Sequence, residues 1–537
     1  MNIAQPIETE TNTNDAAPHM SWGLRRLARS LVVDILPRPH KWLKAVKVYP
    51  PVVADILERR AYVKLLSYMS VGLPGEGEMP AIHARNSGFP RRVLKSLSRR
   101  SESSLEGLAS TAWERVVVER AREIIQYANG KSLPDFDAID SAERTEVARR
   151  TNQTPPRVLY VAHTRLIDVK NGYSVRTHHM AAALKRAGVE VAVSVRPSEA
   201  GGLTQVLDNV LYLAQAAQKT TTIAGFLDAY ISSIEKHIEE FKPDIIHGAS
   251  NWLTGAAASI AARKHGIPFV YEVRGFWEIT RLASFSGYRR SAGFRAQRSL
   301  ERQVATRAAC VATLSDLMID ELEKRGVARE KVFCLPNCGI PQTQEDRKFD
   351  ETETIVFGYV GSLVAYEGVD LLLKAFAVLR RENQSVKLVI AGSGAAEASL
   401  KQLAEKLELS QDVAFLGRFS PADTKQIYQQ ISVIVLPRRA TQVTRLVSPL
   451  KPLEAFSFGK PCLVSDIPPL RHIVCESRAG LTFRPDSRHS LVNVMRVLAT
   501  DDARRKSLSE AGKAFIDNQT WMRNAALLKK KYQKLSA

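Results

Sequence analysis

TIVFGYVG, at residues 354–361, is a short run of apolar residues that does not alternate with polar ones. Such a run indicates a strand buried on both faces, as in a parallel sheet. A helical segment follows at Val369–Arg381, and further apolar runs stand at Val386–Ala391, Val413–Leu416, Val433–Pro437 and Pro461–Val464. This alternation of strands and helices predicts a doubly wound parallel sheet.

The same pattern occurs earlier in the chain. Apolar runs without alternation stand at Arg157–Ala162, Glu190–Val195, Asp244–His247 and Pro268–Val273, and helical segments at Ser174–Ala187 and Leu253–His265 separate them. The sequence therefore predicts an α/β protein with two doubly wound, Rossmann-like domains that face a cleft. In such sheets, ligands bind beyond the carboxyl ends of the strands.

A chain of 537 residues is too long for a single core. We expect a basic, mostly helical and partly disordered N-terminal extension over residues 1–150. The two Rossmann-like domains are expected over residues 151–345 and 346–510, and a last helix, within residues 511–537, is expected to return to the first domain. The segment before the first domain is rich in Asp, Ser, Thr and Pro, as linkers are.

The formal net charge of +20 is unevenly spread. Residues 21–100 hold 16 lysines and arginines against 5 acidic residues. Within them, Trp22–Leu36 places leucines at helical spacing and arginines elsewhere around the helix, which is typical of a short basic amphipathic helix. Such a helix can lie on an anionic membrane surface or pack its leucines on the body of the protein.

The sequence contains no run of about 18 apolar residues, and the polar segment Met1–Asn14 lacks the order of a secretory signal. We therefore expect the chain in the cytoplasm, or on the inner face of the cell membrane if the basic segment docks there. The five cysteines are odd in number and stand mainly in apolar stretches, which favours buried free thiols. No zinc-site spacing is present, and no bound metal is expected.

The segment SPLKPLE, at residues 448–454, carries the most chemical information. Ser448 is a good helix N-cap, and Pro449 suits the first helical position. A helix that begins there would direct the backbone N–H groups around Leu450 at a diphosphate, with Lys451 adding a charge. Glu454 could accept hydrogen bonds from ribose hydroxyls. The alternative is that this segment only starts a helix and that Lys451 faces solvent.

Further phosphate candidates stand in the loop before this segment, namely Arg438, Arg439 and Arg445, since guanidinium groups match phosphate oxygens. Gly361 and Ser362 end the first strand of the second domain, where a glycine lets a ligand approach the backbone. A tight turn explains this glycine equally well.

In the first domain, Gly172 lies at the start of a helix, so its neighbouring amides could face a ligand. Four polar residues, His163, His247, Glu272 and Arg274, stand at or just after predicted strand ends. A single histidine there is more often structural, but four such groups on one sheet edge indicate a site.

These residues resemble the GT-B fold glycosyltransferases, specifically the retaining family-four branch of capsular, exopolysaccharide and O-antigen biosynthesis. The resemblance spans about Arg157–Arg523 and is carried by the segments Asn171–Val191, His247–Glu278, Pro336–Gly339, Gly358–Asp370 and, most specifically, Ser448–Asp466. The N-terminal extension lies outside it.

The resemblance implies that the second domain holds a nucleoside-diphosphate sugar as donor and that the first domain holds a glycan or lipid-linked acceptor. Transfer would proceed without a metal, and no tightly bound cofactor or nucleic acid is expected. Glu454 matches the family carboxylate that contacts the ribose. We assign catalytic roles to Glu272, Arg274 and Lys451. The cationic loop and the helix N-terminus would stabilise the negative charge that develops on the leaving diphosphate.

Three positions depart from the family pattern. Leu446 replaces a glutamate that contacts the donor sugar, and Arg274 stands where relatives often have histidine. Ser362 and Glu367 replace an arginine and a lysine that clamp the diphosphate, so we expect Lys451, with Arg438 or Arg439, to substitute for them.

Three alternatives remain open from the sequence. A sugar-nucleotide epimerase uses the same two-domain shape and would convert its donor without an acceptor. A nucleic-acid-binding protein would explain the positive charge, but the sequence lacks the aromatic and basic motifs of known modules. A non-catalytic scaffold of a polysaccharide assembly complex would turn over no donor.

Overall fold

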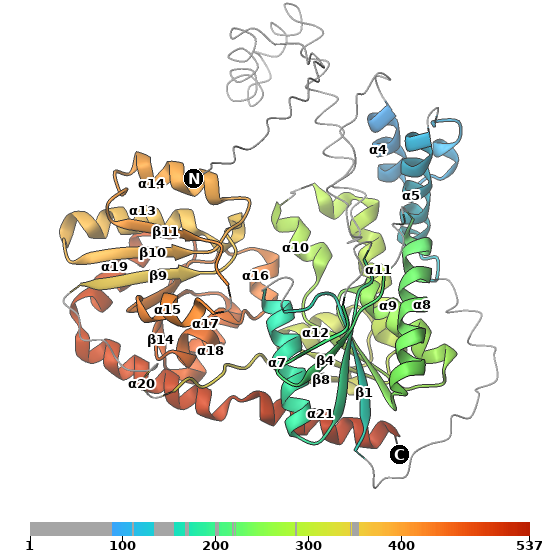
Figure 1. Cartoon of the computed structure of the whole chain (residues 1–537). Helices are drawn as coiled ribbons and strands as arrows, with labels where there is room; N and C mark the ends of the chain where they lie inside the picture. Colours follow the sequence, from blue (N-terminus) through green and yellow to red (C-terminus); the bar gives the residue numbers. More distant parts are fainter. Residues whose placement is uncertain are drawn as a thin grey trace, which may run out of the picture. The chain divides into compact units, whose positions relative to one another are not determined.

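The computed structural model describes residues 89–109, 112–133, 155–166, 171–198, 203–216, 220, 222–284, 287–343, 345, 354–420 and 422–536 (Figure 1). The predicted amphipathic helix at Trp22–Leu36 and most of the predicted linker lie outside these residues. All contacts discussed below lie in one compact unit that holds Lys95–Ala537. No helix in the described part of the chain combines the length and apolar character needed to span a bilayer.

The first sheet has eight strands in the order β3-β4-β2-β1-β5-β6-β7-β8. All neighbouring strands are parallel except β3 and β4, which pair as an antiparallel hairpin at the edge. The strands are β1 (Arg157–Ala162), β2 (Glu190–Val195), β3 (Gln205–Leu207), β4 (Val210–Leu213), β5 (Ile245–Ala249), β6 (Phe269–Val273), β7 (Cys310–Thr313) and β8 (Val332–Cys334).

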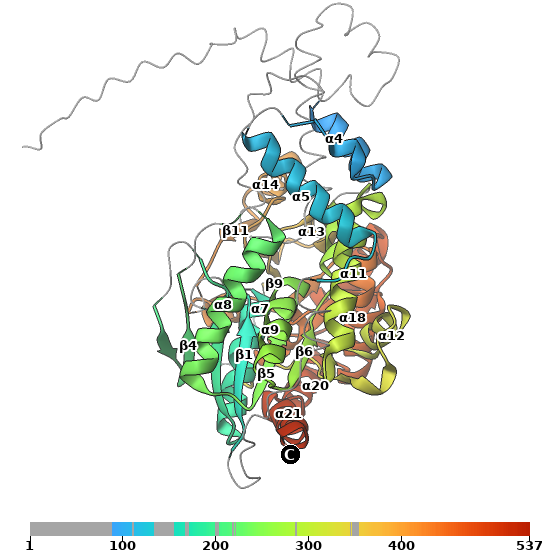
Figure 2. The same ribbon diagram turned by 90° about the vertical axis from the view of Figure 1, so that its right-hand side faces the viewer.

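Helices cover both faces of this sheet (Figures 1 and 2). On one face, α8 (Ile223–Phe241) and α9 (Trp252–Lys264) pack against each other and against β1. On the other face, α7 (Gly172–Arg186) packs with the last helix, α21 (Trp521–Ser536). The remaining helices of this part are α10 (Trp277–Ser284), α11 (Ala292–Arg307) and α12 (Asp316–Lys324).

The second sheet has six strands, all parallel, in the order β11-β10-β9-β12-β13-β14. They are β9 (Ile355–Val360), β10 (Val386–Ala391), β11 (Val413–Gly417), β12 (Val433–Leu436), β13 (Cys462–Ser465) and β14 (Gly480–Phe483). Its helices are α13 (Val369–Glu382), α14 (Glu397–Lys406), α15 (Thr424–Gln429), α16 (Gln442–Leu446), α17 (Lys451–Ser457), α18 (Pro468–Ser477), α19 (Arg488–Thr500) and α20 (Asp502–Asn518). The predicted pair of doubly wound sheets is thus confirmed.

Two helices of the N-terminal extension are described, α4 (Phe89–Arg99) and α5 (Ala112–Ala128). Helix α5 packs along α11 of the first domain. Its Glu123 carboxylate accepts hydrogen bonds from the backbone N–H groups of Ile223 and Ala224, at 2.9 and 3.1 Å, at the start of α8. This part of the extension is therefore joined to the first domain through both side chains and backbone.

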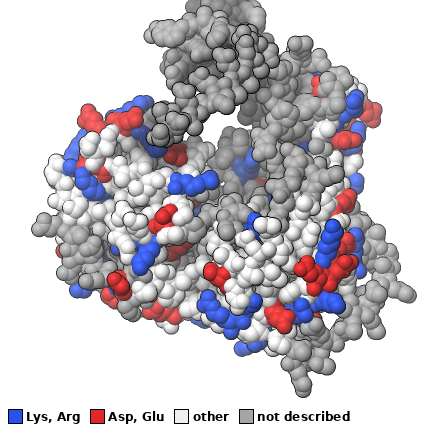
Figure 3. All heavy atoms as spheres, viewed as in Figure 1, with Lys and Arg blue, Asp and Glu red and all other residues white. Residues whose placement is uncertain are grey.

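On the face shown in Figure 3, basic and acidic side chains are interspersed and do not form a patch of one sign. Of the five cysteines, Cys310, Cys338 and Cys462 are buried and Cys334 is half-buried, and all five are free. Cys475 is exposed, because it lies on the outer side of α18, so the prediction of buried thiols is wrong for this residue.

Candidate active site

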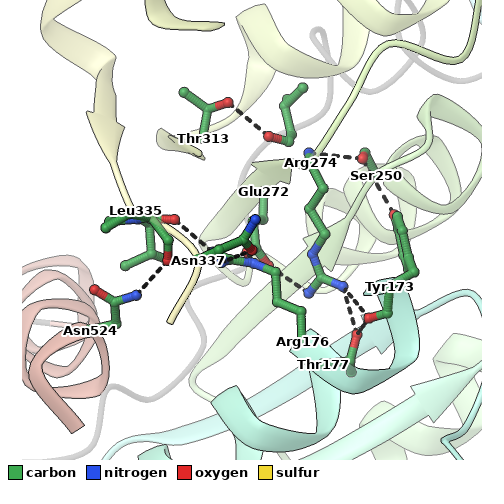
Figure 4. A network of polar contacts seen from close by, with 12 residues as sticks. Tyr173, Arg176, Thr177, Ser250, Glu272, Arg274, Thr313, Leu335, Asn337 and Asn524 are labelled. Atoms are coloured by element: carbon green, nitrogen blue, oxygen red, sulfur yellow. Dashed lines mark hydrogen bonds and ion pairs between the residues drawn. The ribbon is translucent and has the colours of Figure 1, made fainter. Parts of the chain in front are cut away.

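Glu272 lies at the centre of a buried ionic network at the carboxyl edge of the first sheet (Figure 4). Its carboxylate, carried by β6, is wholly buried. Arg176 Nε, from α7, lies 2.6 Å from Oε1, and Arg274 Nη2 lies 2.7 Å from Oε2. Two guanidinium groups therefore neutralise one carboxylate, which leaves the network with a net positive charge.

Two further side chains complete this network. The Tyr160 hydroxyl donates to Glu272 Oε2, and His247 Nε2 lies 3.5 Å from the same oxygen. Burial would raise the pKa of Glu272, but Arg274 and Arg176 hold that pKa well below its usual range. Burial lowers the pKa of His247 in spite of this carboxylate, so the imidazole is neutral.

Both terminal nitrogens of Arg274 donate hydrogen bonds to neighbouring residues. Nη1 donates to the backbone oxygen of Tyr173 at 3.0 Å and to Thr177 Oγ1 at 2.7 Å, and its guanidinium lies 4.7 Å from the centre of the Tyr173 ring. Both Glu272 and Arg274 thus hold the edge of the sheet in place. The catalytic roles that the sequence assigned to the two residues stay predictions.

The network extends to the segment that follows β8. Arg176 donates from Nη2 to the backbone oxygen of Leu335 at 2.7 Å and from Nη1 to Asn337 Oδ1 at 3.0 Å (Figure 4). The Asn337 amide in turn donates to the backbone oxygen of Ser448 at 2.9 Å. A single asparagine therefore connects the Glu272 network to the SPLKPLE segment.

A second ionic cluster lies at the carboxyl edge of the second sheet. Glu367, in the turn η5 (Ala365–Glu367), is buried and receives two cations. Lys451 Nζ lies 2.7 Å from its Oε2, and Arg438 donates to both carboxylate oxygens, at 2.9 and 3.2 Å. The structure thus brings Lys451 together with Arg438, one of the two arginines that the sequence left open.

The surroundings of Lys451 fix its side chain. Its ammonium donates to the Tyr359 hydroxyl at 2.9 Å, and this hydroxyl donates to the backbone oxygen of Ser362 at 2.8 Å. Gly361 has φ +145°, and a Cβ built there would overlap the Lys451 side chain. The glycine therefore makes room for this lysine, while the Ser362 side chain is exposed.

Electrostatics keep the cluster ionised. Burial would raise the pKa of Glu367, but Arg438 and Lys451 lower that pKa to about 2. The pKa of Lys451 is lowered from its usual value by burial and by Arg438, against the opposing effect of Glu367. One carboxylate with two cations leaves a net charge of +1 at this edge.

The other basic candidates lie elsewhere. Arg439 is paired with Asp370 at 2.6 Å and with Asp486 at 2.9 Å, so it connects three segments of the second domain. Arg445 lies exposed on α16. Neither residue touches the Glu367 cluster in the described contacts.

The predicted helix start at Ser448 is wrong. Helix α17 begins at Lys451, and its first helical bond runs from the Glu454 N–H to the Leu450 oxygen at 3.0 Å. In a helix capped by Ser448, the Ser448 oxygen would accept from the N–H of residue 452, and Pro452 has none. Asn337 takes this oxygen instead, and the buried Pro449 lies before the helix. The helix start thus lies three residues later than predicted, and diphosphate binding by its first backbone N–H groups stays a prediction.

Glu454 and Gly172 occupy the positions that the sequence suggested. Glu454 lies in the first turn of α17, half-buried, and accepts a hydrogen bond from the Tyr428 hydroxyl at 3.4 Å. Gly172 is exposed at the start of α7, where the Asn171 side chain caps the helix through Tyr173 and Ser174. A Cβ built on Gly172 would lie 3.4 Å from Leu450 Cδ1, so this helix start adjoins the SPLKPLE segment.

The site contains residues that sequence reasoning did not select. Glu367 was noted only as a departure from a family pattern, yet it anchors both cations. Tyr359 and Asn337 are ordinary in sequence, and only their contacts across the fold show their roles. No group of three or more metal-ligating side chains occurs among the described residues, and metal-free chemistry stays a prediction.

Two family models match the chain, one on each sheet. The model described as "Glycosyl transferase 4-like domain" matches residues 171–338, and the model described as "Glycosyl transferases group 1" matches residues 341–515. Neither match includes the N-terminal 170 residues.

Known proteins with similar sequences carry related names. The D-inositol 3-phosphate glycosyltransferase of Corynebacterium glutamicum is 23% identical over 394 residues, which are 67% of this chain and 91% of that protein. The alpha-monoglucosyldiacylglycerol synthase of Streptococcus pneumoniae is 28% identical over 152 residues, or 28% of this chain and 33% of that protein.

Solved structures show the same architecture. Sucrose-phosphate synthase from Thermosynechococcus elongatus matches with a TM-score of 0.59 and 18% identity, over 71% of this chain and 99% of that one. Anabaena HepE, solved in complex with UDP-glucose, matches with a TM-score of 0.55 and 16% identity, over 70% of this chain and all of that one. At these identities the likeness concerns the fold.

Proposed function

Because the chain is a glycosyltransferase of the GT-B fold that uses a nucleotide-sugar donor, we propose that Lys451 and Arg438 hold the donor diphosphate. The observation that carries this proposal is their joint pairing with Glu367 at the carboxyl edge of the second sheet. In doubly wound folds, ligands bind at this edge. The acceptor is a hydroxyl of a glycan held by the first domain.

The Glu367 cluster suits a diphosphate because it combines fixed donors with excess positive charge. Glu367 holds the two cationic side chains in place, so little side-chain entropy is lost when the donor binds. Lys451 has one ammonium hydrogen left after its bonds to Tyr359 and Glu367. As the bond to the sugar breaks, negative charge grows on the leaving diphosphate, and preorganised cations stabilise it.

Glu454 completes the donor site in this proposal. Its half-buried carboxylate lies one helical turn beyond Lys451, and the Tyr428 hydroxyl orients it. A carboxylate accepts hydrogen bonds readily from the two ribose hydroxyls. Uridine nucleotides are the first donors to test, since HepE was solved with UDP and with UDP-glucose.

The finer features of the reaction rest on the family resemblance of the SPLKPLE segment. We propose transfer with retention of anomeric configuration, in the assembly of a surface polysaccharide on a lipid-linked acceptor. Docking on the inner membrane leaflet through basic residues within 22–100 would bring the enzyme to such an acceptor. Cosedimentation with anionic vesicles tests this point: a chain that lacks residues 1–88 is expected to lose binding, and unchanged binding contradicts it.

Calorimetric titration of the full chain with UDP, GDP and ADP tests the donor site. One of these nucleotides is expected to bind, and Lys451→Ala is expected to weaken it by about 10-fold to 100-fold, because a charge-assisted hydrogen bond is lost. Lys401→Ala serves as control, since Lys401 forms an exposed pair with Glu397 on α14. The proposal fails if none of the nucleotides binds or if the two variants bind alike.

The epimerase alternative is tested with the same protein. Incubation with the bound nucleotide's sugar conjugate alone, followed by chromatography, is expected to show no interconversion of donor sugars. Release of nucleoside diphosphate is expected to rise only when an acceptor is supplied. Interconversion without an acceptor would instead support the epimerase.

A further inference from the structure

The carboxyl edge of the first sheet holds polar atoms that no described residue satisfies. Thr164 Oγ1, both amide atoms of Asn251 and Arg274 Nε are buried without a hydrogen-bond partner. The Asn251 side chain is wholly buried. Native proteins leave few such atoms unpaired, and each one needs an explanation, such as a ligand or an ordered water.

Thr164 and Asn251 follow two neighbouring strands of the first sheet at the same distance in sequence. Strands β1 and β5 are parallel neighbours, and their last paired residues are Val161 and Gly248. Thr164 and Asn251 each stand three residues beyond that pair. Next to Asn251 in sequence, Ser250 Oγ accepts hydrogen bonds from the Arg274 backbone N–H at 3.1 Å and from the Tyr173 hydroxyl at 3.3 Å.

Three aromatic rings lie at the same edge. The His163 ring centre is 6.2 Å from that of Tyr173 and 5.7 Å from that of Trp277, with both pairs in edge-to-face geometry. They come from three segments: the end of β1, the start of α7 and the start of α10. All three residues are partly exposed. We call His163, Tyr173 and Trp277 the aromatic corner.

Two polar groups of this corner, the His163 imidazole and the Trp277 indole N–H, are uncharged and open to a partner. Burial, together with the charge of Arg196, lowers the pKa of His163 to about 3, so its imidazole is neutral and presents one accepting nitrogen. Within the described part of the chain, neither the His163 imidazole nor the Trp277 indole N–H forms a hydrogen bond.

The aromatic corner adjoins the segment that carries Lys451. Gly172, next to Tyr173, faces Leu450, and a Cβ built on Gly275, two residues before Trp277, would lie 3.8 Å from Val447 Cγ2. A molecule bound at the corner would therefore lie beside the SPLKPLE segment, where we place the donor.

We propose that the aromatic corner, with Thr164 and Asn251, forms a subsite for a polyhydroxylated six-membered ring of the acceptor, a pyranose or a cyclitol. Such a ring presents a face of C–H groups, which packs on aromatic rings, and a rim of hydroxyls, which pair with amide, hydroxyl and imidazole groups. A purely apolar ligand would leave the Asn251 amide unpaired, and a cation would be repelled by Arg274. This inference rests on the proposed function, because it describes the acceptor of that reaction.

Saturation-transfer NMR on the full chain tests the subsite with simple ring compounds in place of the whole acceptor. The probes are the methyl α-pyranosides of glucose, galactose and mannose, and myo-inositol, which separate the pyranose from the cyclitol. Trp277→Ala removes a ring of the corner, and Thr164→Val removes one hydroxyl at nearly constant volume. Phe415→Ala is the control, since it removes a partly exposed ring from β11 of the second sheet.

At least one probe is expected to bind, and Trp277→Ala is expected to weaken it by about 5-fold to 10-fold. Thr164→Val should weaken it by about 3-fold, which provides a readout even if the Trp277 variant does not fold. The control variant should bind as the wild type does. The inference is overturned if no probe binds, or if Thr164→Val and a folded Trp277→Ala bind as tightly as the wild type.

Nucleotide binding, measured in parallel, separates the two proposals. The ring variants should leave the affinity for the nucleotide within about 2-fold of wild type, and Lys451→Ala should leave ring binding unchanged. Ring binding that follows the expected pattern in a protein that binds no nucleotide would retain the subsite and reject the proposed donor site.

Discussion

Glu367 is a single carboxylate that holds two cations at the edge of the second sheet. Its partners come from the end of β12 and the start of α17, so one residue joins three segments. Replacing such a buried carboxylate leaves the opposite charges uncompensated, and this usually destabilises the fold more than replacing the whole ion pair by apolar residues. Glu367 is therefore a structural requirement of the site.

Glu367→Gln is expected to lower the free energy of unfolding by about 3 kcal/mol at pH 7. The folded-state pKa of Glu367, about 2, lies below the usual value of 4.5, so its contribution is present above pH 4.5 and is lost as the pH falls toward 2. Urea unfolding at a series of pH values measures this, and the difference between variant and wild type should shrink over that interval. Glu382→Gln, at an exposed pair with Arg496, should change little.

Glu301 titrates in the opposite sense. Burial raises its pKa to about 7, the hydrogen bond from Tyr271 opposes this, and the charge of Glu278 adds to it. Because the folded state holds the proton more tightly, the stability due to this group is complete below pH 4.5 and is lost as the pH rises to about 7. In the Glu301→Gln variant, the free energy of unfolding should decline by about 3 kcal/mol less over this pH interval than in the wild type. Parallel declines in both proteins would contradict the assignment.

The candidate site was predictable in part from single residues. The clustering of Lys451 with an arginine was expected, but the choice of Arg438 over Arg439 depends on which carboxylates surround each one. Glu272 and Arg274 were expected to act on a substrate. Glu272 also pairs with Arg176, which lies 96 residues away in sequence, and no local pattern reveals that contact.

At the scale of secondary structure, the deeply buried strands were the easiest to predict. The bounds of β1, β2 and β10 agree with the sequence prediction, because apolar runs without alternation are unambiguous when both faces are covered. Five strands were missed, each only three or four residues long: β3, β4, β7, β8 and β14. The start of α17 was misplaced because Pro452 has no N–H to bond the Ser448 oxygen, and an asparagine 111 residues away takes that oxygen instead.

Helix α5 is expected to contribute to the stability of the first domain. Glu123→Ala would leave the first N–H groups of α8 without an acceptor, and the free energy of unfolding is expected to fall by about 1–3 kcal/mol. Glu119→Ala, on the exposed side of the same helix, is the matched control and should have little effect. Equal unfolding curves for the two variants would show that this helix does not support α8.

At the scale of the whole molecule, the first domain is built from two distant parts of the chain. Its strands end at Cys334, yet its core includes Trp521, Leu528 and Tyr532 of α21. The Tyr532 hydroxyl lies 2.5 Å from His247 Nδ1, and Asn524 donates to the Pro336 oxygen at 2.8 Å. The last helix of the chain thus packs on the first sheet, whose strands all come earlier in the sequence.

Tyr532→Phe is expected to destabilise the first domain by about 1–3 kcal/mol, because His247 Nδ1 would lose its buried partner. Hydrogen exchange should accelerate in β5 and α21 and stay unchanged in the second sheet. Lys534→Ala, at an exposed position of the same helix, is the control. Exchange that accelerates equally in both sheets would argue against a local role.

The placement of α21 sets an order of events on the ribosome. When Cys334 leaves the exit tunnel, all eight strands of the first sheet have been made, but the helix that covers one face of it is still nearly 190 codons away. The second sheet, which is continuous in sequence, can fold before the first is finished. A truncated translation product that lacks α21 would therefore carry a complete second sheet beside a first sheet that is only partly covered on the α7 face, and the exposed apolar surface would make it prone to aggregation.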